Sequence, residues 1–464
     1  MPSTDPQDGE SILRLGGEPA GLTEVTRRLK HVWDAFSRLR KAGLKRQATA
    51  ALLRSYAGAA SQYALQLQIP TESQVQAYDN TLTTCWQTLA DRPFDNSHKE
   101  RLGLPLRYAG CGAQFAETRQ YAAYWSSAAA TIAEVAAQNR FQSVASFLEA
   151  VPHIAAKLDT ARTGLVQQGV SSFDGVSLAD ALNSKLNQSL LVGLVQKRKH
   201  TALLRSLPES QAAELRAAGG PGSWGFMQYP SEAICTVEDC LWSASLRQRL
   251  GMRRAEANAE ELATVTNTCC LKPREGPVCN TPLDDQGFHA TTDQRGGGVM
   301  RRHKRLEKTV GSLIKRWKDQ EPLYEQRVPA WDRRARNSRG ETIEHAVLDI
   351  QYTDDDGTRW IDVSIRHPAA GNATEVRNAA RRDGEASRKG ERIKHERYPG
   401  SRLTPFVVET PGRIRAEARF WLLAQVRALP EDTQARELDR AYRAISCTVQ
   451  SEIAQQLRRA AGLK

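Results

Sequence analysis

The segment Val347-Leu-Asp-Ile-Gln-Tyr-Thr-Asp-Asp-Asp-Gly-Thr-Arg-Trp-Ile-Asp-Val-Ser-Ile-Arg366 holds two runs in which apolar and polar residues alternate. This period of two predicts two strands, and the Asp-Asp-Gly between them predicts the tight turn of a hairpin. If the apolar faces of the two strands coincide, Asp349 and Asp362 share the polar face. Two carboxylates on one face predict a site for a hard divalent cation such as Mg²⁺, and a solvated polar face is the alternative interpretation.

A basic helix and a third strand are expected after the hairpin. Lys394 and Tyr398 lie four residues apart, hence on one face of the expected helix. The apolar run Leu403-Thr-Pro-Phe-Val-Val-Glu409 follows, and a Thr-Pro-Gly turn ends it. The order of Asp, Asp-Val, Lys-x-x-x-Tyr and Pro-Phe-Val-Val-Glu resembles the restriction-like endonuclease domain of site-specific non-LTR retrotransposons. That domain belongs to the PD-(D/E)XK nuclease superfamily.

The resemblance implies a metal-dependent endonuclease that hydrolyses a phosphodiester bond of DNA with Mg²⁺ or Mn²⁺. Asp349 and Asp362 would be the metal-binding carboxylates, Lys394 the catalytic lysine and Tyr398 its neighbour. Glu325 lies where superfamily members often carry a further acidic residue, so it is a candidate third ligand. The sequence departs from the family at two positions, because Leu348 replaces the usual Pro and Ser364 occupies the lysine position of a standard Asp-x-Lys.

Positive charge is concentrated in the last third of the chain. The net charge of the 464 residues is +12, and residues 300–464 contain 34 Lys and Arg against 24 Asp and Glu. Clustered cations beside a candidate nuclease site indicate binding to nucleic acid, with a solvated basic surface as the alternative. DNA is the expected partner, and the RNA of the element is a possible second one. The candidate nucleic-acid-binding residues are Arg301, Arg302, Lys304, Arg305, Arg388, Lys389, Arg392 and Arg397.

A zinc knuckle is the second metal site that the resemblance implies. In the retroelements, a Gly-Pro-Gly turn and a Leu-Arg-x-Arg-Leu-Gly helix precede such a knuckle. Residues 219–251 contain the same turn and the same helix motif in that order. The ligands here would be Cys270, Cys279, His289 and Asp293, with Asp293 at the family's final Cys position. Zinc takes about four nitrogen, sulfur or oxygen ligands. The alternative interpretation is that these four residues lie in a loop that ordinary packing holds, and that they bind no zinc.

The predicted fold class is α+β, with a largely helical N-terminal module followed by a small mixed-sheet nuclease-like domain flanked by helices. We expect a disordered N-terminus at 1–21 and a helical module at 22–218. That module resembles the thumb that follows the polymerase palm in the retroelements. A linker with the degenerate zinc-knuckle region covers 219–298, and the nuclease domain covers 299–464. No Tyr/Phe-x-Asp-Asp precedes the thumb-like part, so a polymerase palm is not expected.

Composition excludes several classes of protein. No apolar run is long enough to span a bilayer, so no membrane association is expected. Eight irregularly spaced cysteines favour a reducing compartment, and the resemblance implies the nucleus. Two other functions stay open: a nucleic-acid-binding retroelement remnant that no longer cuts, and an unrelated helical scaffold with a small sheet. The sequence does not predict an oligomeric state.

Overall fold

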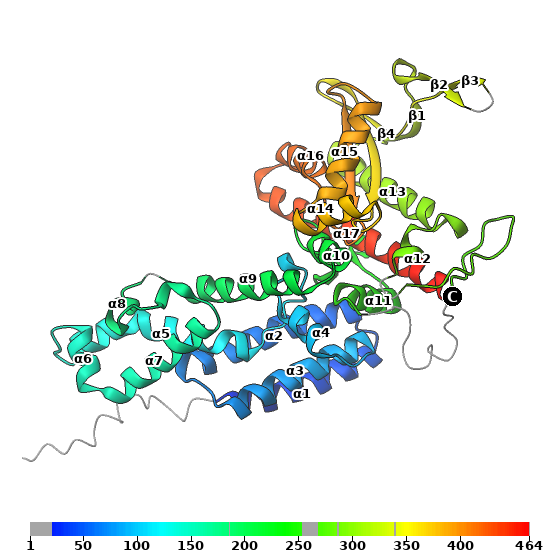
Figure 1. Ribbon diagram of the computed structural model, residues 1–464. Helices are drawn as coiled ribbons and strands as arrows, with labels where there is room; N and C mark the ends of the chain where they lie inside the picture. Colours follow the sequence, from blue (N-terminus) through cyan, green and yellow to red (C-terminus); the bar gives the residue numbers. More distant parts are fainter. Residues whose placement is uncertain (1–20, 185, 253–267, 285–286, 338–339, 464) are drawn as a thin grey trace, which may run out of the picture. The chain divides into compact units, whose positions relative to one another are not determined.

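The computed structural model describes residues 21–463 except 185, 253–267, 285–286 and 338–339. The protein is mostly helical, with a small four-stranded mixed sheet in its C-terminal part (Figure 1). This agrees with the predicted α+β class. Two compact units are present: residues 1–42, 53–85 and 113–199 belong to unit 1, and residues 43–52, 86–112 and 200–464 belong to unit 2. The predicted disorder of residues 1–21 lies outside the described residues, apart from Gly21.

Unit 1 is entirely helical in its described residues. It contains α1 (Leu22–Lys41), most of α2 (Arg46–Leu67) and α3 (Glu72–Ala90), the helices α5 (Ala116–Gln138), α6 (Val144–Ala150), α7 (Pro152–Gln167) and α8 (Leu178–Leu182), and the start of α9 (Gln188–Ser206). Asp79 accepts hydrogen bonds from the backbone N–H groups of Ala116 and Glu117, which satisfies two free donors at the start of α5. Trp125 and Phe173 pack in the core of this unit.

Unit 2 includes short helices from two of the three segments that form it. They are α4 (Asn96–Gly103), α10 (Glu209–Ala218), α11 (Asp239–Arg249) and α12 (Phe288–Thr292). The glycine-rich segment at 219–225, predicted as a domain boundary, lies inside this unit. Its backbone is paired, because Gly220 donates its N–H to Arg107 O at 3.2 Å and Pro221 O accepts from Ile414 N–H at 3.0 Å.

The sheet has the strand order β1-β4-β5-β6. Its strands are β1 (Leu323–Arg327), β4 (Val347–Asp354), β5 (Gly357–Arg366) and β6 (Leu403–Glu409), and only β5 and β6 run parallel. The predicted hairpin is confirmed: Asp354 pairs with Gly357, whose φ of +107° suits glycine in a tight turn. A parallel pair needs a crossover, and α14 (Ala373–Arg381) and α15 (Glu385–Arg397) supply it.

Helices cover both faces of this sheet (Figure 1). One face packs against α13 (Gly298–Lys318), α16 (Ala416–Arg427) and α17 (Glu431–Ala460). On α13, Leu306, Val310, Leu313 and Ile314 recur at intervals of three and four residues, and all are buried in this core. On the other face, α15 lies so close to β6 that a Cβ on Gly390 would be 3.0 Å from Val407 Cγ1. This close approach determines where the side chains of α15 reach the sheet.

A separate two-stranded ribbon stands between β1 and β4 in the sequence. It consists of β2 (Arg333–Asn337) and β3 (Gly340–Glu344), which pair with each other and not with the larger sheet. This ribbon was not among the elements expected from the sequence. Among the helices that the structure describes, none is long and apolar enough to cross a membrane.

Candidate metal centres

The hairpin brings Asp349 and Asp362 together. The ladder between β4 and β5 ends at the pair Ile350–Ile361, and the two aspartates are the next residues along each strand. Asp349 Oδ2 accepts a hydrogen bond of 2.6 Å from the backbone N–H of Val363, which holds this carboxylate against β5. The Asp362 side chain is only 6% exposed. The structure therefore places two carboxylates side by side at one end of the hairpin, as the alternation predicts.

The two carboxyl groups have opposite pKa shifts. Burial raises the pKa of Asp362, an effect that Lys394 opposes and Asp349 reinforces. Burial alone would also raise the pKa of Asp349, but hydrogen bonds from His303 and Val363 hold it below its usual value. Asp349 is therefore the group that is ionised at neutral pH, whereas Asp362 retains a proton more readily.

Lys394 reaches this pair from α15. Its Nζ lies 2.6 Å from Asp362 Oδ2. The position of the helix depends on Glu409 at the end of β6, whose Oε1 accepts 3.1 Å hydrogen bonds from both the N–H and the hydroxyl of Ser387. Ser387 is the third residue of α15, so a buried carboxylate satisfies a free donor at the start of the helix. Lys394 lies about two turns further along and reaches the polar end of the hairpin.

Tyr398 follows the last residue of α15. Its ring packs against Trp331, with 5.7 Å between the centroids, in a small cluster that also contains Leu348 and Leu403. Burial, followed by the charges of the two aspartates, raises the pKa of Tyr398. Tyr398 therefore lies close to the carboxylates and anchors the end of the helix that carries Lys394.

Helix α13 adds two side chains that the sequence analysis did not assign to this centre. His303 Nε2 lies 3.0 Å from Asp349 Oδ1 and 3.9 Å from Glu307 Oε2. One ligand atom from each of these three residues lies within 4.8 Å of the others. Glu325, predicted as the third ligand, is instead 62% exposed and pairs with Lys304. The prediction for Glu325 is corrected: the third carboxylate near Asp349 is Glu307.

The predicted nucleic-acid-binding residues divide into two groups. Arg302 is buried and donates to Thr291 O and Gln456 Oε1, and burial lowers its pKa to about 10. The Arg397 side chain is 15% exposed and donates to Trp331 O at 2.8 Å. These two arginines stabilise the fold, which corrects the prediction for them. The others are at least partly exposed on α13 and α15: Arg301, Lys304, Arg305, Arg388, Lys389 and Arg392.

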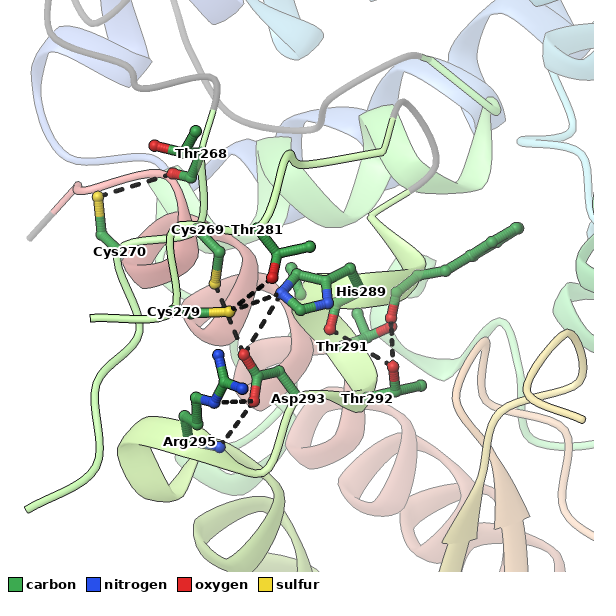
Figure 2. A network of polar contacts seen from close by, with 12 residues as sticks. Thr268, Cys269, Cys270, Cys279, Thr281, His289, Thr291, Thr292, Asp293 and Arg295 are labelled. Carbon is green, nitrogen blue, oxygen red and sulfur yellow. Dashed lines mark hydrogen bonds and ion pairs between the residues drawn. The ribbon is translucent and has the colours of Figure 1, made fainter. Parts of the chain in front are cut away.

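A second cluster consists of Cys269, Cys279, His289 and Asp293 (Figure 2). Cys279 Sγ lies 3.3 Å from His289 Nε2, His289 Nε2 lies 3.4 Å from Asp293 Oδ2, and Cys269 Sγ lies 3.8 Å from that oxygen. Ligand atoms at 2.0–2.3 Å from a tetrahedral zinc ion are about 3.3–3.8 Å apart. The spacing of the four groups therefore matches the ligand shell of zinc.

One predicted ligand of this cluster is replaced by its neighbour. The Cys270 sulfur lies 3.8 Å from Thr268 O, whereas the Cys269 sulfur faces Asp293 (Figure 2). Cys269 exchanges backbone hydrogen bonds with Thr281 and Asn280, and Cys270 donates its N–H to Ala460 O. These opposite directions are expected of adjacent residues in an extended segment. Cys269 therefore takes the position predicted for Cys270.

Hydrogen bonds hold the other candidate ligands of the cluster in place. Asp284 accepts hydrogen bonds from the N–H groups of Phe288 and His289 at 2.8 and 2.7 Å, which positions the start of α12. Asp293 Oδ1 accepts from the N–H of Arg295 at 2.9 Å. Such outer contacts orient the ligands of a metal ion.

No protein-family model matches the chain, and no match was found among curated proteins.

Proposed function

We propose that this protein is a metal-dependent DNA endonuclease of the restriction-like type found in site-specific non-LTR retrotransposons. The observation that supports the proposal is the lysine at the carboxylate pair, with Lys394 Nζ 2.6 Å from Asp362 Oδ2. Two strands and a helix thus bring carboxylates and an ammonium group to one place. Phosphodiester hydrolysis uses carboxylates to hold a cation and a positive group to stabilise the charge that develops on the phosphate.

Asp349 and Asp362 would hold Mg²⁺ or Mn²⁺, since hard cations prefer carboxylate oxygens. When bound, the cation would act as a Lewis acid, which lowers the pKa of a bound water molecule and polarises the phosphate. The Lys394 ammonium, no longer needed to neutralise Asp362, would donate to the phosphate oxygens on which negative charge develops. Tyr398 would keep Lys394 in place by fixing the end of α15.

The basic groups of α13 and α15 would bind the DNA backbone. Arg305 and Arg392 have the most exposed of these side chains, at 71% and 69%. Arg305 forms an ion pair of 3.5 Å with Glu452, and Arg392 forms one of 3.5 Å with Glu396. Such pairs exchange readily for phosphate contacts, because exposed ion pairs contribute little stability.

Nicking of supercoiled plasmid tests the proposal. We expect the full-length protein to nick with Mg²⁺ or Mn²⁺ and not with EDTA. Asp362→Asn and Lys394→Ala should each slow nicking by about 100-fold or more, since a positioned charge at such a site contributes several kcal/mol. Lys389→Ala is the matched control on α15. Lys389 pairs with Glu375 at 2.6 Å and is one of several candidate phosphate contacts, so this variant should bind DNA modestly more weakly but still nick the plasmid.

Two outcomes would contradict parts of this proposal. If Lys394→Ala nicks as fast as the wild type, the lysine has no catalytic role. If the wild type nicks with neither cation but binds plasmid in a salt-dependent way, the protein is a nucleic-acid-binding remnant and not an enzyme.

We also propose that Cys269, Cys279, His289 and Asp293 bind a structural zinc ion. The distances between their ligand atoms, 3.3 to 3.8 Å, support this second proposal. In the absence of a cation, burial raises the pKa of the Cys269 thiol to about 12, and a bound metal would remove that proton. A closed set of four protein ligands is typical of a structural zinc site.

Metal analysis after dialysis tests the zinc proposal. The wild type should retain about one zinc ion per chain. Cys269→Ser should lose it, whereas Cys270→Ser, the adjacent matched control, should keep it. Retention in Cys269→Ser together with loss in Cys270→Ser would favour Cys270 as the ligand, and a wild type without zinc would reject the site.

A further inference from the structure

The carboxylate pair lies beside a histidine and a buried glutamate of α13. His303 and Glu307 are four residues apart, so they project from one face of the helix toward β4. His303 Nε2 contacts Asp349 Oδ1 at 3.0 Å. The imidazole hydrogen-bonds a carboxylate, so this ring nitrogen is the one that carries the proton.

The spacing of these three groups fits one octahedral cation. Ligand atoms at about 2.1 Å from such an ion lie about 3.0 Å apart when adjacent and about 4.2 Å apart when opposite. The distances from His303 Nε2 to Asp349 Oδ1 and Glu307 Oε2 are 3.0 and 3.9 Å. One ligand atom from each residue lies within 4.8 Å of the others, so a single ion can contact all three after small movements.

The environment of Glu307 is an independent reason to expect a cation. Its side chain is only 1% exposed, and burial raises its pKa. Within the described part of the chain, Oε2 accepts no hydrogen bond of good geometry, and its nearest cation is Lys304 Nζ at 2.9 Å. Lys304 also pairs with the exposed Glu325. Glu307 therefore shares its nearest ammonium with a second carboxylate, and a buried carboxylate is costly unless its charge is fully compensated.

We infer that His303 and Glu307 bind the cation together with Asp349, beside Asp362, which makes the centre a mixed imidazole and carboxylate site that selects Mn²⁺ over Mg²⁺. This inference rests on the proposed function, because it concerns the same cation. Mg²⁺ takes oxygen ligands and keeps its water, whereas an imidazole nitrogen favours first-row transition metals. As a ligand, His303 would be the neutral imidazole with its proton on Nδ1 and the Nε2 lone pair free for the cation, and any second proton would pass to solvent.

Pulsed EPR of the Mn²⁺-loaded full-length protein tests the inference without any variant. One equivalent of Zn²⁺ is added first, so that the cysteine cluster does not take up Mn²⁺. A histidine ligand couples its ¹⁴N nucleus to the manganese electron spin, and the coupling should change when the histidines carry ¹⁵N. A Mn²⁺ signal without nitrogen coupling would overturn the inference.

Equilibrium binding gives a second readout. His303→Ala should weaken Mn²⁺ binding by about 10-fold or more and Mg²⁺ binding by less than about 3-fold, since only Mn²⁺ gains from the imidazole. Glu307→Gln should weaken the binding of both cations. His395→Ala is the matched control, because His395 lies on α15 and pairs with Glu417 at 2.8 Å. The His395→Ala variant should bind Mn²⁺ with the same affinity as the wild type.

These results separate the inference from the proposed function. Equal Mn²⁺ affinity in His303→Ala and the wild type overturns the inference, whether or not the wild type nicks plasmid. Loss of the nitrogen coupling in His303→Ala supports it. Failure of the wild type to nick with either cation overturns the nuclease and leaves the test of the ligand set intact, because EPR and binding require no cleavage.

Discussion

Asp349 and Asp362 differ in the charges they carry without a cation. Asp349 accepts hydrogen bonds from His303 and Val363, which favours its ionised form, whereas Asp362 is more deeply buried and its pKa is raised. Lys394 is the group that offsets the charge of Asp362. A divalent cation would favour ionisation of both carboxylates and free the ammonium. If the proposed cation binds here, the protonation of the pair would therefore change with it.

Glu437 makes a pH-dependent contribution to the stability of the fold. This nearly buried carboxylate of α17 accepts hydrogen bonds from Arg316 Nε and Nη2 at 2.8 and 2.7 Å, and from Trp317 Nε1 at 3.1 Å. The Arg316 guanidinium lowers the pKa of Glu437 to about 2, against an ordinary value of 4.5. A lowered folded-state pKa stabilises the fold above pH 4.5, and this contribution is lost as the pH falls toward 2.

Glu437→Gln should therefore lower the free energy of unfolding by roughly 1–3 kcal/mol at pH 7. The difference from the wild type should shrink as the pH is lowered from 4.5 to 2. Urea denaturation at several pH values measures it. Glu431→Gln, at the exposed start of α17, is the control and should change stability by less than about 0.5 kcal/mol. A pH-independent difference for Glu437→Gln would contradict the assignment.

At the scale of elements, the sequence predicted the hairpin well because both of its signals are local. Alternation of apolar residues fixes which side chains face the core, and Asp-Asp-Gly fixes the turn, so the register follows. The position of α13 over the core was also predictable from its apolar stripe. The contact of Lys394 with Asp362 depended on the resemblance, since no local pattern indicates that a residue 32 positions later returns to the hairpin.

The errors concern side chains whose direction depends on tertiary structure. His303 and Glu307 lie four residues apart in a strongly basic helix, and nothing in the sequence indicates that they contact Asp349. Glu325 belongs to the edge strand β1, where a φ of +53° accompanies its exposed side chain. Cys269 and Cys270 are adjacent, and only the pairing with residues 279–281 determines which sulfur faces Asp293. These choices require knowledge of long-range packing.

At the scale of the whole molecule, unit 2 combines segments that are distant in sequence. Arg249 of α11 donates to Gly110 O at 2.9 Å and to Leu106 O at 2.7 Å, and Arg247 donates to Ala90 O at 2.9 Å. Gln47 accepts from Val237 N–H at 2.9 Å. These buried contacts connect residues before position 113 to the helices that precede the sheet. The predicted domain at 299–464 is thus one part of a larger packing unit.

A fragment of residues 299–464 should consequently fold poorly by itself, although it carries most of the net positive charge. Its long helix α17 contacts α11 and the segment around Phe226 in the full chain, with Ser446 Oγ accepting from Phe226 N–H at 3.1 Å. Removing those partners exposes buried apolar surface of α17 to water. Near-UV circular dichroism and thermal melting of the fragment and of the full-length chain measure the effect. We expect a weak near-UV signal and no cooperative transition for the fragment. A fragment that melts cooperatively at the temperature of the full-length protein would show that the sheet and its covering helices fold independently.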